Sequence, residues 1–209
     1  MSSVLVLTSS ALGEASVSSQ LVRDAVAALR LRDPKVRIVT RDLGSSPVPH
    51  LTLDSAAAIR GGEPANAAQA AARALSDELV AELKAADTVV IGAPMYNFGM
   101  ASTLKAWFDH VLRAGVTFSY VDGAPKGLLE GKRAIVVESR GGFYSEGPAQ
   151  AMDSQEPHLR SLLGFIGIAD ISFVRAEKLA FGPDSRSQAI DAARARIGDV
   201  IANGLRQAA

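Results

Sequence analysis

The chain has 209 residues, and because it carries 22 lysines and arginines against 22 aspartates and glutamates its formal net charge is zero. A neutral chain has no overall field to attract nucleic acid or an anionic membrane, so we expect neither as a partner. Cysteine is absent, which excludes disulfides, thiolate metal sites and thiol nucleophiles. Any redox chemistry must therefore use a cofactor.

The first residues, Met1-Ser2-Ser3, run directly into an apolar stretch without a basic leader or an apolar segment long enough for export. No apolar run elsewhere approaches the roughly 20 residues of a membrane span. We therefore expect a cytoplasmic protein. No shift in composition marks a boundary, so residues 1–209 are expected to form a single domain.

The chain opens with a strand signal followed by a helix signal. Residues 3–8 are a continuous apolar run with polar ends, typical of a strand buried on both faces of a parallel sheet. Residues 18–32 then carry apolar side chains at helical spacing until Asp33-Pro34 interrupts the pattern. These two segments predict a first strand–helix unit.

The same alternation continues to the end of the chain and predicts an α/β fold. Strict alternation indicates a doubly wound, five-stranded parallel sheet in the order 2-1-3-4-5, with helices on both faces. Residues 43–65 and 115–131 do not fit the alternation and are expected to be long functional loops. The further strands are expected at residues 36–40, 87–92, 133–138 and 170–175, and the further helices at residues 66–85, 101–114, 155–164 and 186–206.

A hydroxyl-rich turn at residues 8–19 joins the first strand to the first helix. Helix N-termini carry unpaired N–H groups, and serine hydroxyls add donors, so this turn suits an anion. No lysine or arginine precedes Arg23, and the patterns GxxxxGK[ST] and GxGxxG are both absent. A terminal phosphate monoester fits these features. The alternative is that the serines only cap the helix.

Two more turns follow strands at the same expected edge of the sheet. After the third strand, Tyr96 and Phe98 flank Asn97, a set suited to a planar ring with a polar edge. The alternative is a loop folded back on the core. After the fourth strand, Gly141 and Gly142 would let the backbone approach a ligand, although paired glycines also serve ordinary turns.

Five segments of the chain resemble the FMN-dependent NADH azoreductases, which belong to the flavodoxin-like NAD(P)H:quinone oxidoreductases. The resemblance spans nearly the whole chain and implies bound FMN, NADH or NADPH as electron donor, a quinone or azo acceptor, and a homodimer with two interfacial sites. It also implies ping-pong hydride transfer through FMN N5, with no catalytic side chain. The segments are Ala93 to Phe98, the helix with Leu104-Lys105 and Phe108-Asp109, Arg113 to Phe118, Ser139 to Gly142, and Leu163 to Gly167.

The resemblance also implies particular site residues. Departures from the family's pattern fall mainly at residues 43–65 and 143–157, which in the family shape the acceptor pocket. Phe165 has a second interpretation, as a core residue in apolar surroundings. The implied contacts are Ser10, Ser16, Val17 and Ser18 for the FMN phosphate end; Met95, Tyr96, Asn97, Phe98, Ser139, Arg140, Gly141 and Gly142 for the isoalloxazine and ribityl groups; and Tyr120 and Phe165 from the neighbouring subunit over the flavin.

Two other functions compete with this interpretation. A dinucleotide-binding dehydrogenase would use Asp42 for the ribose hydroxyls, but its glycine fingerprint is missing. A flavodoxin-type electron carrier would bind FMN without turning over NAD(P)H, but its partners are usually steered by an acidic surface and this chain is neutral. No metal site is expected, because His50, His110 and His158 are not spaced as ligands and fit surface or loop positions.

Overall fold

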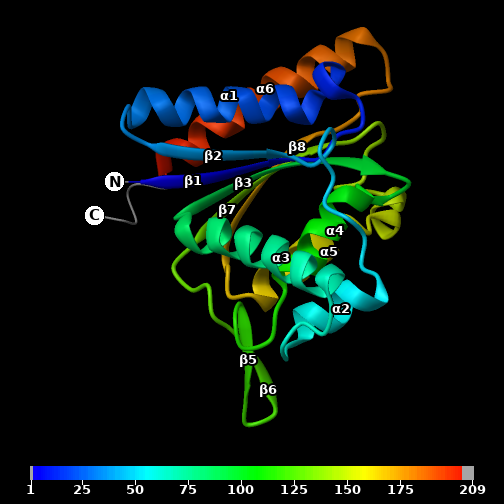
Figure 1. The fold of residues 1–209 in the computed structure, drawn as a ribbon. Helices are drawn as coiled ribbons and strands as arrows, with labels where there is room; N and C mark the ends of the chain where they lie inside the picture. Colours follow the sequence, from blue (N-terminus) through cyan, green and yellow to red (C-terminus); the bar gives the residue numbers. More distant parts are fainter. Residues whose placement is uncertain (1, 204–209) are drawn as a thin grey trace.

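Residues 2–203 are described by the computed structural model, which has a parallel sheet between two layers of helices (Figure 1). Neighbouring strands pair in the order β2-β1-β3-β7-β8, and every one of these pairings is parallel. Because β7 and β8 are the fourth and fifth parallel strands along the chain, the expected order 2-1-3-4-5 is confirmed. The strands are β1 (Ser3–Thr8), β2 (Arg37–Asp42), β3 (Thr88–Tyr96), β7 (Arg133–Ser139) and β8 (Asp170–Ala176).

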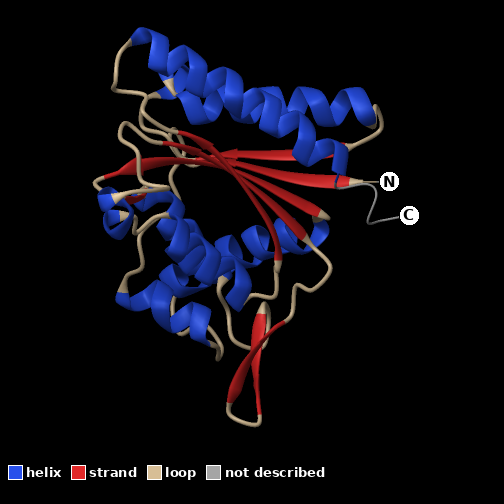
Figure 2. Ribbon diagram, turned by 180° about the vertical axis from the view of Figure 1, so that it is seen from behind, coloured by secondary structure: helices blue, strands red, loops and turns tan. Residues whose placement is uncertain are grey.

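Helices cover both faces of the sheet, as expected (Figures 1 and 2). The last helix begins three residues before its expected start, and residues 204–206 of that expectation lie outside the described residues. Within residues 2–203 no helix is long and apolar enough to cross a membrane. One face carries α1 (Val17–Arg32) and α6 (Pro183–Asn203); the other carries α3 (Ala67–Ala85), α4 (Ser102–Val111) and α5 (Glu156–Phe165).

The central strands are unbroken runs of apolar residues because both of their faces are buried. Leu5 and Leu7 of β1 belong to the core under α3, α4 and α5. Val4 and Val6 alternate with them and belong to the second core, under α1 and α6. Side chains alternate between the two faces of a strand, so a two-sided core requires an unbroken apolar run.

The expectation of a long loop at residues 43–65 is wrong, because α2 (Leu53–Arg60) forms within it. Thr52 and Ser55 make a capping box at its start, in which each side chain accepts a hydrogen bond from the backbone of the other residue. At its end, Arg73 Nε of α3 donates to the Ala58 carbonyl at 2.6 Å. A local cap and a remote arginine together stabilise this short helix.

A hairpin of β5 (Phe118–Val121) and β6 (Ala124–Gly127) replaces the loop expected at residues 115–131. Asp122 and Gly123 form its turn, with φ of 52° and 79°, the left-handed pair that a type I′ turn requires. The hairpin projects from the three layers in both views (Figures 1 and 2). Its base packs tightly, since a Cβ at Gly127 would lie 2.1 Å from the Gly167 nitrogen.

His110 is not the surface or loop residue that we expected. It lies in α4 and is buried beside Trp107 and Val111, on the apolar face of that helix. Its Nε2 lies 3.0 Å from the Pro49 carbonyl oxygen and, because a carbonyl only accepts, donates to it. Burial lowers the pKa of this imidazole, which favours the neutral ring. His110 therefore links α4 to the segment before α2.

Candidate functional site

A cavity of about 160 Å³ opens at the edge of the sheet where β1, β3 and β7 end. Ligands of open parallel sheets bind at this carboxyl edge. A larger hollow of about 640 Å³ lies at the opposite edge, beside Val4, Thr88 and Arg133, where strands begin. Eight predicted cofactor residues line the smaller cavity: Ser10, Ser16, Val17, Met95, Tyr96, Ser139, Arg140 and Gly141.

The four other predicted cofactor residues lie within two positions of a lining residue in the chain but do not line this cavity. Ser18 is buried in the first turn of α1, and Gly142 follows the lining residue Gly141. Asn97 and Phe98 continue the turn beyond Tyr96, and 41% of Phe98 is exposed. The three turns predicted from the sequence therefore meet, although not every residue of each turn faces the cavity.

Tyr96 joins the turn after β1 to the turn after β3. Its hydroxyl lies 3.2 Å from Ser10 Oγ and accepts a hydrogen bond from the Ala11 N–H at 3.0 Å. Deeper in the same region, Ser9 Oγ donates to the Gly92 carbonyl at 2.8 Å. The two contacts of its hydroxyl hold the phenol ring on the wall of the cavity, and the Ser9 bond ties the turn after β1 to β3.

Donors gather at the start of α1, where the helix faces the cavity. Ser16 is the N-cap, because its Oγ accepts from the Ser19 N–H at 3.2 Å. Gln20 makes the first intrahelical bond, to the Ser16 carbonyl, so the N–H groups of Val17 and Ser18 have no helical acceptor. The hydroxyls of Ser16 and Ser18 lie 3.1 Å apart. Hydroxyls and orphan N–H groups at a helix start are a site for an anion.

The turn after β3 holds two residues in the left-handed conformation. Asn97 and Phe98 have φ of 47° and 71°, and they connect β3 to the short antiparallel strand β4 (Gly99–Met100). A left-handed conformation costs roughly 1–2 kcal/mol for a residue with a Cβ. Because Tyr96 pairs with Gly99 across it, this is a two-residue hairpin turn, and it requires the same left-handed pair as the turn between β5 and β6.

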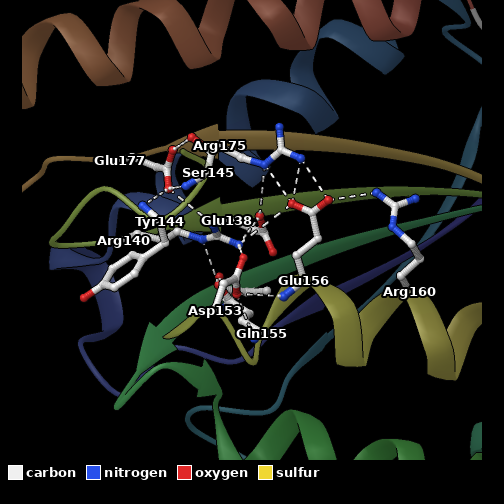
Figure 3. Close-up of polar contacts among 11 residues, drawn as sticks. Glu138, Arg140, Tyr144, Ser145, Asp153, Gln155, Glu156, Arg160, Arg175 and Glu177 are labelled. Carbon is white, nitrogen blue, oxygen red and sulfur yellow. Dashed lines mark hydrogen bonds and ion pairs between the residues drawn. The ribbon is translucent and has the colours of Figure 1, made fainter. Parts of the chain in front are cut away.

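The Arg140 side chain lies in a buried network of charges behind the cavity, which Figure 3 shows. The side chain has no exposed surface, and its nitrogens reach Glu138 at 2.8 Å, Asp153 at 3.0 Å and Glu177 at 3.2 Å. Its Nε also donates to Gln155 Oε1 at 3.1 Å. We conclude that Arg140 offers only its main chain to the cavity, because its guanidinium is already committed within the protein.

Glu138 has an unusual protonation equilibrium in this network. Burial raises the pKa of its carboxyl to about 8, in spite of the opposing effect of the adjacent Arg140 guanidinium. In the described part of the chain Glu138 Oε1 has no hydrogen-bond partner. The raised pKa shifts the carboxyl toward its neutral form, which lowers the cost of burying it, while the Arg140 guanidinium favours the charged form.

The two glycines after β7 are held by the segment that follows β8. The carbonyl of Gly141 accepts from the Ala180 N–H at 3.0 Å, and that of Gly142 accepts from the Lys178 N–H at 2.7 Å. A Cβ at Gly142 would lie 2.9 Å from the Tyr144 ring. Glycine at this position therefore lets the aromatic ring approach the turn.

Tyr120 and Phe165, by contrast, do not reach the cavity of their own chain. Tyr120 lies in the projecting hairpin with 64% of its surface exposed. Phe165 ends α5 and packs against Phe118 of the hairpin, with ring centroids 4.5 Å apart. Phe165 is only partly buried and adjoins the core, so both interpretations from the sequence remain open.

A family profile described as a flavodoxin-like fold matches residues 2–201. The chain belongs to this flavodoxin-like family. It is 55% identical over 200 residues to an FMN-dependent NADH:quinone oxidoreductase of Hyphomonas neptunium, with 96% of each chain covered. A protein of the same name from Ralstonia nicotianae is 49% identical over 95% of this chain and 96% of its own. The crystal structure of an azoreductase from Bacillus anthracis superposes with a TM-score of 0.88 at 28% identity, covering 96% and 99% of the two chains.

The resemblance to the flavodoxin-like oxidoreductases that the sequence motifs indicated is thus confirmed.

Asp42 offers no free carboxylate of the kind that a dinucleotide-binding dehydrogenase would use. Its oxygens accept from the Gly44 N–H at 3.0 Å, the Ser45 hydroxyl at 2.8 Å and the Thr8 hydroxyl at 3.2 Å. Asp42 stabilises the turn after β2.

Five residues that line the cavity were not among the predicted contacts. Leu12, Ala15 and Pro94 lie in or beside the turns already predicted, whereas the other two lie in a segment where no contact was predicted. Leu179 and Arg186 line the cavity from the segment after β8 and from the first turns of α6. Both follow the fifth strand, and ligands lie beyond the carboxyl ends of strands, so the fold already indicated this segment. Arg186 is the more informative of the two, since the sequence predicted no cation at the phosphate end.

Proposed function

We propose that this flavodoxin-like chain binds FMN and uses NADH or NADPH to reduce quinones and aromatic azo compounds. One observation carries the proposal: the turns after β1, β3 and β7 line one cavity, to which the start of α1 brings Ser16 and Val17 and the end of β3 brings Met95 and Tyr96. The relatives named FMN-dependent NADH:quinone oxidoreductases and the solved azoreductase support this donor and these acceptors.

The residues present fit the two ends of FMN. At the phosphate end, Ser10, Ser16 and Ser18 offer hydroxyls next to the orphan N–H groups of α1. At the ring end, Met95 and Tyr96 are partly buried at the cavity wall, and the glycines after β7 allow close approach of the backbone. FMN differs from a triphosphate in needing no P-loop lysine.

The chain's part in the reaction is binding and orientation. Bound FMN supplies the hydride chemistry between the nicotinamide and the acceptor. Hydrogen bonds to the turn after β1 hold the Tyr96 ring, and the β3–β4 pairing holds the Asn97–Phe98 turn, so the protein itself fixes the wall against which a ligand is oriented. We propose that donor and acceptor occupy the same face in turn, as in a ping-pong scheme, with a solvent proton completing the reduction.

We also propose that two copies of the chain form a homodimer in which Tyr120 and Phe165 cover the partner's flavin. The support is geometric, because the hairpin projects away from the body and its exposed tyrosine cannot serve the chain's own cavity. An exposed aromatic residue on an extended arm is typical of a surface that another protein covers.

The proposed activity is tested by an absorbance spectrum and an anaerobic titration with NADH, followed by steady-state assays with a quinone. We expect a flavin spectrum that bleaches with NADH, and turnover without any partner reductase. A flavodoxin-type carrier would bind FMN but show negligible turnover. Protein that stays colourless and gains no activity with added FMN would contradict the proposal.

The dimer is tested by light scattering on the wild-type protein and on Tyr120→Ala. We expect the wild type at twice the chain mass, and a variant that keeps its FMN while its KM for the quinone rises several-fold, because the covering ring is lost. A wild type that is monomeric at full activity would refute the dimer and leave the chemistry standing.

Two further expectations stay predictions. A single domain over residues 1–209 should give one cooperative unfolding transition in denaturant. The cytoplasmic location is tested by fractionating cells that express the chain at its native level.

A further inference from the structure

Arg186 is a cation at the cavity that nothing in the binding of a flavin ring explains. It lies in the first turns of α6 and lines the cavity together with Ser10, Ser16 and Val17 of the phosphate end. We propose that Arg186 supplies the positive charge that holds the phosphate of the cofactor. This proposal rests on the proposed binding of FMN and assigns the charge that the serine-rich turn lacks.

The electrostatic surroundings of Arg186 favour an anion. None of the residues that line the cavity is acidic. The nearby Glu14 already faces Arg23, at 3.3 Å. Arg140 is the other arginine of the lining, and its guanidinium is paired with buried carboxylates. Between residues 2 and 203, no ion pair engages Arg186, so this guanidinium is the cavity's available positive charge.

The chemistry of a phosphate monoester calls for such a charge. Near pH 7 the group carries a charge of roughly −1.5 to −2. The hydroxyls of Ser16 and Ser18 and the N–H groups of α1 offer dipoles but no countercharge. A guanidinium can donate two parallel hydrogen bonds to phosphate oxygens. With Arg186, two helix starts from opposite ends of the chain converge on one anion.

The alternative is that Arg186 is an ordinary exposed arginine whose location at the cavity has no consequence. Arg196 provides the matched comparison, because it is an exposed arginine of the same helix without an ion pair among the described residues and away from the cavity. A general effect of removing one surface charge from α6 would appear equally in both variants.

The test compares the affinities of FMN and riboflavin, which lacks the phosphate, for flavin-free protein. Dissociation constants are measured by quenching of flavin fluorescence for the wild type, Arg186→Ala, Arg186→Lys and Arg196→Ala. We expect Arg186→Ala to raise the dissociation constant of FMN by about 5- to 30-fold and that of riboflavin by less than about 2-fold. Arg186→Lys should fall between, and added salt should weaken FMN binding less in Arg186→Ala than in the wild type.

Each outcome decides a separate question. Three outcomes would overturn the role of Arg186 and leave the proposal of FMN binding intact. In Arg186→Ala the binding of FMN and of riboflavin could weaken equally, or neither could weaken. The loss of FMN affinity could also be equally large in Arg196→Ala. A wild type that binds neither flavin would overturn the proposed function itself. Far-ultraviolet circular dichroism of each variant shows whether α6 is retained.

Discussion

At the start of α1 the Ser16 residue borders a cavity, with the Ser18 hydroxyl 3.1 Å from its own and two helical N–H groups beside them. At the end of β7, by contrast, each guanidinium nitrogen of Arg140 has a partner within the protein. The first turn keeps donors for a ligand. In the second turn the Arg140 side chain bonds to groups within the protein, and the main chain of the turn lines the cavity. A cofactor site needs both, because donors are useful only when the opposite wall does not move.

The largest effect should come from breaking the network behind the second turn. Arg140→Ala leaves Glu138, Asp153 and Glu177 without their shared cation, and removing one partner of a buried ion pair costs about 3–5 kcal/mol. We expect the thermal midpoint to fall by roughly 6–20 °C. Arg160→Ala, which removes an exposed partner of Glu156, is the control. A shift of equal size in the two variants would disprove the network's role in stability.

A smaller effect should appear in the pH dependence of stability. The pKa of Glu138 is raised to about 8 in the folded chain, from 4.5. Between these values the folded state binds more protons than the unfolded state, so stability falls as pH rises, by at most about 1.4 kcal/mol per pH unit. Glu138→Gln should flatten this slope in urea unfolding at pH 5.5, 7 and 8.5.

The exposed residue Glu146 gives the control for that experiment. Glu146→Gln should leave the slope as in the wild type. Glu138→Gln with an unchanged slope would show that the buried carboxyl is ionised throughout, held by Arg140.

The smallest effect concerns the first turn. Ser16→Ala removes the acceptor for the Ser19 N–H, and loss of an N-cap costs about 1 kcal/mol. We expect a thermal midpoint lower by roughly 2–4 °C, together with weaker FMN binding and nearly unchanged riboflavin binding. Ser187→Ala, an exposed serine of α6, is the control. A loss of stability without any loss of FMN affinity would show that Ser16 only caps the helix and does not bind the phosphate.

The strands were predictable because their signal is local. The apolar run at residues 3–8 gave the bounds of β1 directly, since a strand buried on both faces must be apolar along its length. The hairpin was missed although Asp122-Gly123 is a strong turn signal between two short strands. Helix α2 depends partly on Arg73 of α3, a contact that no local pattern contains.

The position of the cavity could be predicted from the sequence, but the contacts of the side chains around it could be predicted less well. Strand ends gave the three turns, since a parallel sheet brings the carboxyl ends of its strands to one edge. The direction of the Arg140 side chain was not predictable, because Asp153 and Glu177 are remote in the sequence and become its partners only through folding. Arg186 was missed for the same reason, because it is far in the sequence from the serines with which it lines the cavity.

The left-handed pair Asn97–Phe98 has a consequence for redesigning this protein toward other acceptors. Glycine, asparagine and aspartate adopt that backbone conformation most easily, and most other side chains disfavour it. Variants at these two positions are therefore limited first by the backbone and only then by the fit to a substrate. Libraries aimed at new acceptors should therefore vary the segment at residues 143–157. Within it, Tyr144 already contacts the Phe98 ring edge-on, at 6.1 Å between centroids.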